Sequence, residues 1–307
     1  MSGEKAVLTL KTTDGKTFAT DALAGFRCRK ERYTPYSALD ATVIGGEGIS
    51  EVVEAKLSIG EKILHRGIMD GLTVTKSGGR TLLRLSSRGF SSMLAQNELA
   101  PGLMAGLSLN SLMSEKMIVP NVTWQNSSQT ARYIYVNEHD SQWSAIVSLS
   151  LELNEDYPYI GEVNEVRLSP VNPKTINPEN VFEEGCTGDY SKMVSNYHMK
   201  DVNGTYSYNY TDGFAAQQGI VRHKYIAYDR QFVGLSDYGL QYRLNFTERG
   251  CKSKFLSYIG YSGEELRDKV TFPDGAVHEI SAIEVCGNAK KGIFTKDICY
   301  FDKYCNK

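Results

Sequence analysis

Three consecutive residues, His139, Asp140 and Ser141, are of the types that form a hydrolase triad. In such a triad the serine attacks, the histidine takes its proton and the aspartate orients the histidine, so the three side chains must converge. Consecutive residues cannot converge in this way. Because a helical pattern begins here, we interpret Asp140 or Ser141 as the residue that caps the first turn of a helix.

Pairs of carboxylates could serve a glycoside hydrolase, in which two acids flank the bond that is cut. The close pairs in the sequence are Glu152 with Glu155 and Glu183 with Glu184. Nothing in the sequence places either pair across a cleft, and a chain with 36 Asp and Glu residues contains such pairs by chance. The stretch 106–110, Gly-Leu-Ser-Leu-Asn, lacks the final glycine of a nucleophile elbow. We therefore predict no catalytic residue and no enzymatic activity.

The cysteines could bind a metal or form disulfides. They are Cys28, Cys186, Cys251, Cys286, Cys299 and Cys305. No two of them have the short gap usual for zinc ligands, and His278 stands eight positions before Cys286. In a chain without a secretory signal the default state of cysteine is the reduced thiol. The sequence thus favours free thiols over a metal site, and it predicts no cofactor.

Three tyrosines, Tyr206, Tyr208 and Tyr210, alternate with other residues, which is typical of a strand with one aromatic face. Exposed aromatic rings can stack on sugars or bases. They can also pack between subunits, where tyrosine is enriched. No basic field accompanies these tyrosines, so we favour an interface or packing face, with glycan binding as the alternative.

Composition narrows the class of protein. The chain has 307 residues, a mass of 34.2 kDa, a formal net charge of -2 and a sequence pI near 6.3. This balance argues against nucleic acid as a specific partner. No apolar run approaches the roughly 20 residues that span a bilayer, and the start of the chain lacks a signal peptide. We expect synthesis and folding in a cytoplasm, without a membrane anchor.

Residues 1–89 have many short, apolar-rich segments separated by glycine-bearing turns, which predicts an antiparallel β-barrel or sandwich. The expected internal residues of this domain are Leu57, Ile59, Ile63, Ile68, Leu72, Val74, Leu83 and Leu85. At Phe90 the apolar spacing becomes helical. We therefore place the first domain boundary at residue 89.

Residues 90–170 read as an α/β module. Ser108 can cap a short helix, and a strand at 133–136 is followed by a second helix. One side of this second helix carries Trp143, Ile146, Val147 and Leu151. Two short strands, 157–160 and 165–168, then form a hairpin around Gly161.

Residues 171–307 begin with a proline-rich linker and continue as a second β-rich region. The prolines of the linker are Pro170, Pro173 and Pro178. The expected strands lie at 205–211, 222–229, 242–247 and 280–285. No residue-level repeat relates this region to residues 1–89.

The order of these parts, with several short motifs, resembles a known family. The motifs are Gly67-Ile68-Met69-Asp70, Ser87-Arg88-Gly89-Phe90, the set Ser108, Leu109, Leu112 and Met113, and the set Asp140, Ser141, Gln142, Trp143 and Ile146. They resemble the baseplate hub proteins of contractile phage tails, the late-control-D family, which includes the hub portions of type VI secretion spikes and R-type bacteriocins. The resemblance covers residues 1 to about 170.

This resemblance implies a mainly β fold with an α/β insertion, in which two tail-tube-like antiparallel barrels (1–89 and 171–307) flank the module (90–170). It implies a structural homotrimer that forms a ring in a virion or phage-like particle, assembled in a bacterial cytoplasm. Its expected partners are a tail tube protein, a central spike protein and baseplate wedge proteins. The hub portion of a non-contractile tail-tip protein is an alternative, as is a carbohydrate-binding β-protein.

Overall fold

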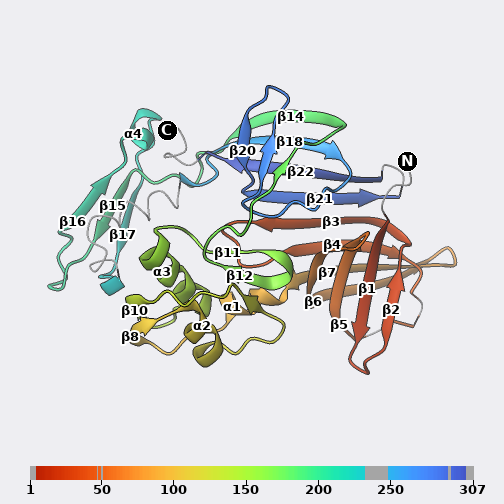
Figure 1. The fold of residues 1–307 in the computed structure, drawn as a ribbon, viewed down its shortest axis with the longest axis horizontal. Helices are drawn as coiled ribbons and strands as arrows, with labels where there is room; N and C mark the ends of the chain where they lie inside the picture. The colour runs from red at the N-terminus through yellow and green to blue at the C-terminus, as the bar shows by residue number, and fades with distance from the viewer. Residues whose placement is uncertain (1–4, 47, 50, 232–247, 290–291, 302–307) are drawn as a thin grey trace.

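The computed structural model describes residues 5–301 apart from residues 47, 50, 232–247 and 290–291. Its largest feature is one antiparallel sheet of eleven strands, to which both ends of the described chain contribute (Figure 1). A module with helices and a separate three-stranded sheet lie beside it. The predicted class, mainly β with an α/β insertion, is confirmed.

Residues 6–89, which we call the first half, form seven strands joined by short connections. They are β1 (Ala6–Thr12), β2 (Thr17–Thr20), β3 (Leu23–Glu31), β4 (Ala38–Ile44), β5 (Val52–Ile59), β6 (Lys62–Ser77) and β7 (Arg80–Gly89). Along β7 every second residue is buried. Because successive side chains of a strand point to opposite faces, this alternation turns one face of the sheet to the core.

The long strand β6 pairs with different neighbours along its length. It pairs with β5 over Lys62–Ile68 and with β7 over Gly67–Ser77, with a register shift between Met69 and Gly71. Gly67 lies at the crossing point, where a Cβ atom would come within 2.0 Å of the Arg88 carbonyl oxygen. Only glycine permits so close a backbone approach.

Residues 90–170 form the α/β module. Its elements are η1 (Phe90–Ser92), α1 (Met93–Gln96), β8 (Gly102–Leu107), α2 (Leu109–Ser111), the π-helix η2 (Leu112–Lys116), β9 (Thr123–Trp124), β10 (Ala131–Val136), α3 (Gln142–Asn154), β11 (Tyr159–Ile160), η3 (Glu162–Asn164) and β12 (Glu165–Arg167). Ser108 caps α2 through a reciprocal capping box with Ser111. The predicted helices and hairpin are present, whereas strand β8 was not expected.

The chain after the module forms the second half, built mainly on four long strands. These are β14 (Val181–Gly188), β18 (Lys252–Ile259), β21 (Ala282–Asn288) and β22 (Gly292–Tyr300). A smaller sheet contains β13 (Thr175–Ile176), β19 (Lys269–Thr271) and β20 (Val277–Glu279). The linker residues of β13 thus pair with β19, in parallel.

Between β14 and β18 the chain leaves the large sheet and forms a separate unit. Its described elements are β15 (Asn196–Met199), β16 (Tyr208–Thr211), α4 (Gly213–Gln217) and β17 (His223–Ile226). The three strands make their own sheet in the order β16-β15-β17. The strand expected at 242–247 lies outside the described residues.

The two halves share one sheet because β3 pairs with β21, from Gly25 opposite Asn288 to Glu31 opposite Ala282. The full order is β14-β18-β22-β21-β3-β4-β7-β6-β5-β1-β2. The expected β-regions at the two ends of the chain are therefore continuous through backbone hydrogen bonds. The β3–β21 pairing is thus the joint between the two halves.

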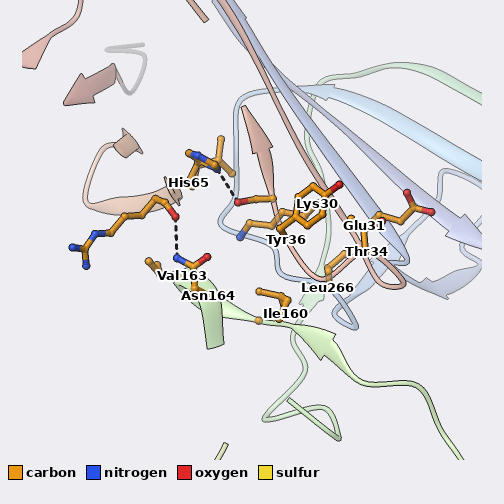
Figure 2. Close-up of a pocket in the computed structure, with 13 residues that line it drawn as sticks. Lys30, Glu31, Thr34, Tyr36, His65, Ile160, Val163, Asn164 and Leu266 are labelled. Atoms are coloured by element: carbon orange, nitrogen blue, oxygen red, sulfur yellow. Dashed lines mark hydrogen bonds between the residues drawn. The ribbon is translucent and has the colours of Figure 1, made fainter. Parts of the chain in front are cut away.

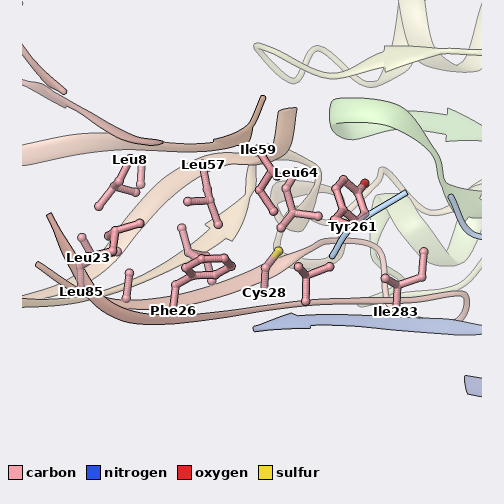
Figure 3. Packing of buried hydrophobic residues seen from close by; sticks show 14 of the residues in the cluster. Leu8, Leu23, Phe26, Cys28, Leu57, Ile59, Leu64, Leu85, Tyr261 and Ile283 are labelled. Atoms are coloured by element: carbon pink, nitrogen blue, oxygen red, sulfur yellow. The ribbon is translucent and has the colours of Figure 1, made fainter. Parts of the chain in front are cut away.

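Buried side chains of both halves form one hydrophobic core (Figure 3). It joins Leu57 and Ile59 of the first half to Tyr261 and Ile283 of the second. Of the expected internal residues, Leu57, Ile59, Leu83 and Leu85 are buried and Ile63, Ile68 and Leu72 are half-buried. The prediction for Val74 was wrong, because β6 extends past the residues that pair with β5 and leaves this side chain 45% exposed.

The module has a core of its own, formed by α3, the β8–β10 sheet and the short helices. Trp143, Ile146 and Leu151 on α3 are buried as predicted, and Val147 is half-buried. The two cores explain why the module reads as a distinct unit in the sequence: each has enough apolar side chains to exclude water on its own side of the joint.

Candidate functional site: the two free edges of one sheet

The triad-type residues at the start of α3 have separate structural roles. The Ser141 hydroxyl caps the helix by accepting a hydrogen bond from the Ser144 backbone N–H at 3.1 Å. The Asp140 carboxylate accepts bonds from the backbone and side-chain nitrogens of Asn137. His139 is exposed and lies 3.3 Å from Glu98. The three side chains therefore do not converge.

The paired carboxylates also lie apart from any cleft. Glu152 is on the last turns of α3, and Glu155 follows as its left-handed C-cap residue. Glu183 and Glu184 are successive exposed residues of β14, so their side chains point to opposite faces of the sheet. Neither pair has the shared orientation toward a bond that glycoside hydrolysis requires.

Within the described part of the chain, no group of three or more His, Cys, Asp or Glu residues is placed to hold a metal ion. His278 packs edge-on against the rings of Phe272 and Phe301. Cys286 lies on β21, half-buried, beside Glu284. Cys305 lies outside the described residues.

The three tyrosines do not share one face. Tyr208 and Tyr210 are on β16 opposite Met199 and Tyr197, on the side that holds the small core of this sheet. Tyr206 precedes the strand, and its ring meets Tyr225 edge-on at 5.1 Å. Strict alternation over 205–211 suggested one face, but the strand begins only at Tyr208.

The other face of this small sheet carries a polar aromatic cluster that sequence reasoning missed. His198 stacks on Tyr225 with ring centroids 4.6 Å apart, and its Nε2 lies 2.9 Å from Nδ1 of His223. These residues meet because β15 pairs in parallel with β17. No short-range signal identifies a parallel pair whose strands are separated by a hairpin and a helix.

The geometry that stands out in the large sheet is a run of eight strands, β14-β18-β22-β21-β3-β4-β7-β6, in which every neighbouring pair is antiparallel. Four of these strands come from each half. At one end of the run lies β14, and at the other the C-terminal part of β6. Both are edges, and an open edge presents unpaired backbone N–H and C=O groups.

The β14 edge is exposed on both of its faces. Six of its eight residues are exposed, and Val181 and Gly185 are half-buried. In the described structure β14 pairs with β18 alone. The strand carries the acids Glu183 and Glu184 and no base, and Phe182 is 56% exposed. It is therefore an acidic edge with one apolar anchor.

The opposite edge is the part of β6 from Gly71 to Ser77, which among the described strands pairs with β7 alone. It carries Lys76 as its charged residue, and β7 beside it adds the exposed Arg80 and Arg84. Thr73, Val74 and Thr75 are exposed. This edge is thus basic where β14 is acidic, and both offer an exposed apolar side chain.

A cluster of four charged groups joins the module to both halves. The carboxylate of Asp156, after α3, contacts the guanidinium of Arg32 and lies 2.7 Å from Arg267. Glu279 lies 3.3 Å from Arg32 and 2.8 Å from Arg267. Burial would raise the pKa of Asp156, but the two arginines hold it below its ordinary value. The carboxylate is therefore kept ionised where three regions of the fold meet.

A second polar contact at this joint is uncharged (Figure 2). The buried His65 lies 2.8 Å from the hydroxyl of Ser37 through Nδ1 and 2.8 Å from that of Ser87 through Nε2. Burial lowers the pKa of His65 to about 3. Asn164 of the module donates to the Arg66 carbonyl oxygen at 2.9 Å.

The space between these residues is small. The cavity that they line with Leu266 and Ile160 has about 10 Å³ of room, roughly what one water molecule needs. A larger hollow of about 400 Å³ lies between the start of β3 and the β21–β22 hairpin, and its charged groups Lys5 and Asp21 pair with each other. The smaller cavity holds the Ser37 hydroxyl beside His65 but has no room for a substrate, and the described residues that line the larger hollow include no serine, threonine or cysteine.

No helix among the described residues is long and apolar enough to cross a membrane. No protein-family model and no curated protein matches the sequence. Solved structures do match over nearly the whole chain. A tail protein from Neisseria meningitidis MC58 superposes with a TM-score of 0.69 at 14% identity, covering 97% of each chain.

Two further matches extend this comparison. The 43 kDa tail protein of prophage MuSo2 from Shewanella oneidensis has a TM-score of 0.69 at 12% identity, covering 97% of this chain and 98% of that one. An Escherichia coli component of the type VI secretion system, described as structurally similar to the T4 tail proteins gp27 and gp5, has a TM-score of 0.53 at 8% identity and covers 91% and 73%. The chain has the fold that these tail and type VI secretion proteins share.

Proposed function

We propose that the chain is a structural subunit of a phage-like tail: the hub of a contractile baseplate, of which three copies form a ring between tail tube and central spike. The observation that carries the proposal is the run of eight alternating strands with an open edge at each end. An even number of alternating strands leaves edges that run in opposite directions. The β14 edge of one copy can therefore pair antiparallel with β6 of the next.

Pairing of two different edges is a heterologous contact, which closes into a ring when the rotation per subunit allows it. Each copy contributes two groups of four strands, so three copies supply six such groups, the number that a six-fold tail tube presents. Ring closure also covers the open edges at β14 and at the end of β6, and open edges are otherwise sites of aggregation. The shared fold with the tail proteins supports this arrangement.

The sheet face opposite the core would line the channel of the ring. On β3 this face carries Arg27 and Arg29, and on β4 Asp40, all exposed. Arg27 pairs with Glu284 of β21 at 2.6 Å, and Arg88 pairs with Asp70 at 2.7 Å. Paired charges of opposite sign keep this wall hydrated and keep its net charge small, which suits the lining of a channel.

In this role the protein is not an enzyme and has no cofactor. Its partners are two further copies of itself, the tail tube, the spike and the baseplate wedges, and its place is a virion or phage-like particle. The same ring would serve a non-contractile tail tip. Sheath and wedge genes beside the gene for this chain would identify the contractile type.

Charge reversal at the edges tests the ring. Changing Glu183 and Glu184 to Lys places bases against Lys76 and Arg80 of the next copy, and like charges across an interface cost several kcal/mol. We expect the trimer mass in light scattering to fall to that of a monomer. Adding Lys76→Glu and Arg80→Glu to the same chain should restore it.

The matched control is Glu61→Lys, which makes the same change at an exposed turn between β5 and β6. This variant should assemble like the wild type. A trimer that persists in the double lysine variant would show that these edges do not form the contact.

A further inference from the structure

Four polar atoms lie in the core of the second half without a hydrogen-bond partner among the described residues. They are both carboxylate oxygens of Asp297, Oε1 of Glu264 and the hydroxyl oxygen of Tyr258. Asp297 and Glu264 are 0% exposed and Tyr258 is 1% exposed. A buried polar group that is left unpaired destabilises the fold, so such a group of atoms needs a physical explanation.

The groups that act on Asp297 come from three elements. They are Cys299 on β22, Tyr258 on β18, and Tyr261, Glu264 and Asp268 in the segment 260–268. Each is neutral or acidic. The nearby bases have other partners: Lys254 lies 3.4 Å from Asp274, and Lys30 lies 3.0 Å from Glu265.

Two ionised carboxylates cannot both be stable in this setting. Burial, followed by the charge of Glu264, raises the pKa of Asp297 well above its ordinary value. Burial also raises the pKa of Glu264. Two acids that share a buried site without a cation titrate as a pair, and the first proton taken up neutralises the repulsion.

The segment that carries Glu264 connects all three regions of the fold. Glu265 pairs with Lys30 of the first half. Arg267 pairs with Asp156 of the module. Asp268 accepts hydrogen bonds from the backbone nitrogens of Lys174 and Glu265. Whatever holds residue 264 against the sheet therefore helps to hold the joint together.

We propose that Asp297 and Glu264 share a proton and form a latch that fastens segment 260–268 to strands β18 and β22. With the proton in place, the carboxyl groups and the Tyr258 hydroxyl can bond to one another. When the proton is lost, two buried negative charges repel and the segment loosens from the sheet. The joint between the two halves and the module is then weakened by alkali.

The sign of the effect follows from the raised pKa of both acids. The folded chain binds more protons than the unfolded chain between the unfolded and folded pKa values, so stability is lost as pH rises through this interval. Asp297→Asn removes one charge and keeps the shape. We expect its melting temperature to exceed that of the wild type by several degrees at pH 9, with the difference shrinking toward zero near pH 5.

Glu264→Gln should give the same pH profile, and Asp40→Asn, the same type of change on the exposed face of β4, should leave the wild-type profile unchanged. In the wild type, hydrogen exchange corrected for its intrinsic pH dependence should accelerate at 260–268 between pH 6 and pH 9. Parallel pH profiles for wild type and Asp297→Asn would overturn the latch.

A bound cation is the competing occupant of the same atoms. The test is to melt the wild type and Asp297→Asn with EDTA and with added Mg²⁺ or Ca²⁺. The latch predicts no difference between these conditions. The latch would be overturned in favour of a bound metal ion by two results together. The melting temperature of the wild type would rise with added metal, and the purified wild type would contain metal that Asp297→Asn lacks.

Discussion

The two halves of the large sheet contribute four strands each to one continuous run, yet they are stabilised differently. The first half is covered by its own strands β5, β1 and β2. Its apolar core is almost all aliphatic, and it also buries the polar side chains of Lys30 and His65. The second half is crossed by the segment 260–268, and it buries the acids Glu264 and Asp297 beside its apolar residues.

This difference shows that two sets of four strands can continue one sheet although the side chains buried beneath them differ in chemical type. The first half is held mainly by apolar burial, which depends little on pH. The second half depends on paired and shared charges, whose contribution depends on protonation.

The strongest test of this comparison removes a buried leucine from each half. Leu57→Ala and Leu256→Ala both create a cavity at a residue that is 0% exposed, which costs about 2–5 kcal/mol. Because one core spans both halves, each change should shift a single cooperative unfolding transition, followed by circular dichroism and tryptophan fluorescence in denaturant. Two separate transitions would show that the halves unfold independently.

The next test separates the module from the sheet. Asp156→Ala leaves Arg32 and Arg267 without their shared carboxylate and should cost about 2 kcal/mol, less than a fully buried pair because Asp156 is partly exposed. Chemical denaturation measures the loss. The exposed Glu138→Ala is the matched control and should change stability little. Equal effects of the two changes would mean that the cluster does not hold the joint.

A smaller effect tests how the stability of the first half depends on pH. The pKa of His65 is lowered from 6.5 to about 3 by burial, so the unfolded chain binds the extra proton between these values. Its contribution is present above pH 6.5 and is lost as pH falls toward 3. Acid should therefore weaken the first half, and His65→Gln should flatten this part of the stability curve. An unchanged acid slope in that variant would contradict the assignment.

The smallest expected effect concerns the edges. Glu183→Lys with Glu184→Lys alters exposed residues of β14, so the free energy of unfolding of the monomer should change by no more than about 0.5 kcal/mol. The same double change should abolish assembly. A large loss of monomer stability would mean that these acids serve the fold and not the contact between copies.

Much of the first half and of the module could be predicted because the signals there are local. Alternation marks strands such as β7, and the Ser108 and Ser141 caps mark the helix starts. Leu57 and Leu85 could be placed in the core from spacing alone. The exposure of Val74 could not, because it depends on where β5 stops covering β6.

Most of the candidate site could not be predicted from the sequence. The pairing of β3 with β21 joins residues more than 250 positions apart, and no local pattern encodes it. Without that pairing, β14 and the end of β6 are not recognisable as the two edges of one run. The buried acids Glu264 and Asp297 also resemble ordinary surface acids in a strand and a loop, since burial is a property of the fold.

The most direct test of the central claim is the solution mass of the full chain by light scattering, with images of the particles in negative stain. The account predicts a species of about three times 34.2 kDa that appears as a ring with six lobes around a channel. It also predicts that the ring is lost in the Glu183→Lys, Glu184→Lys variant and restored by the charge-swapped chain. A wild-type chain that stays monomeric at high concentration, both alone and with the proposed tube and spike partners, would contradict it.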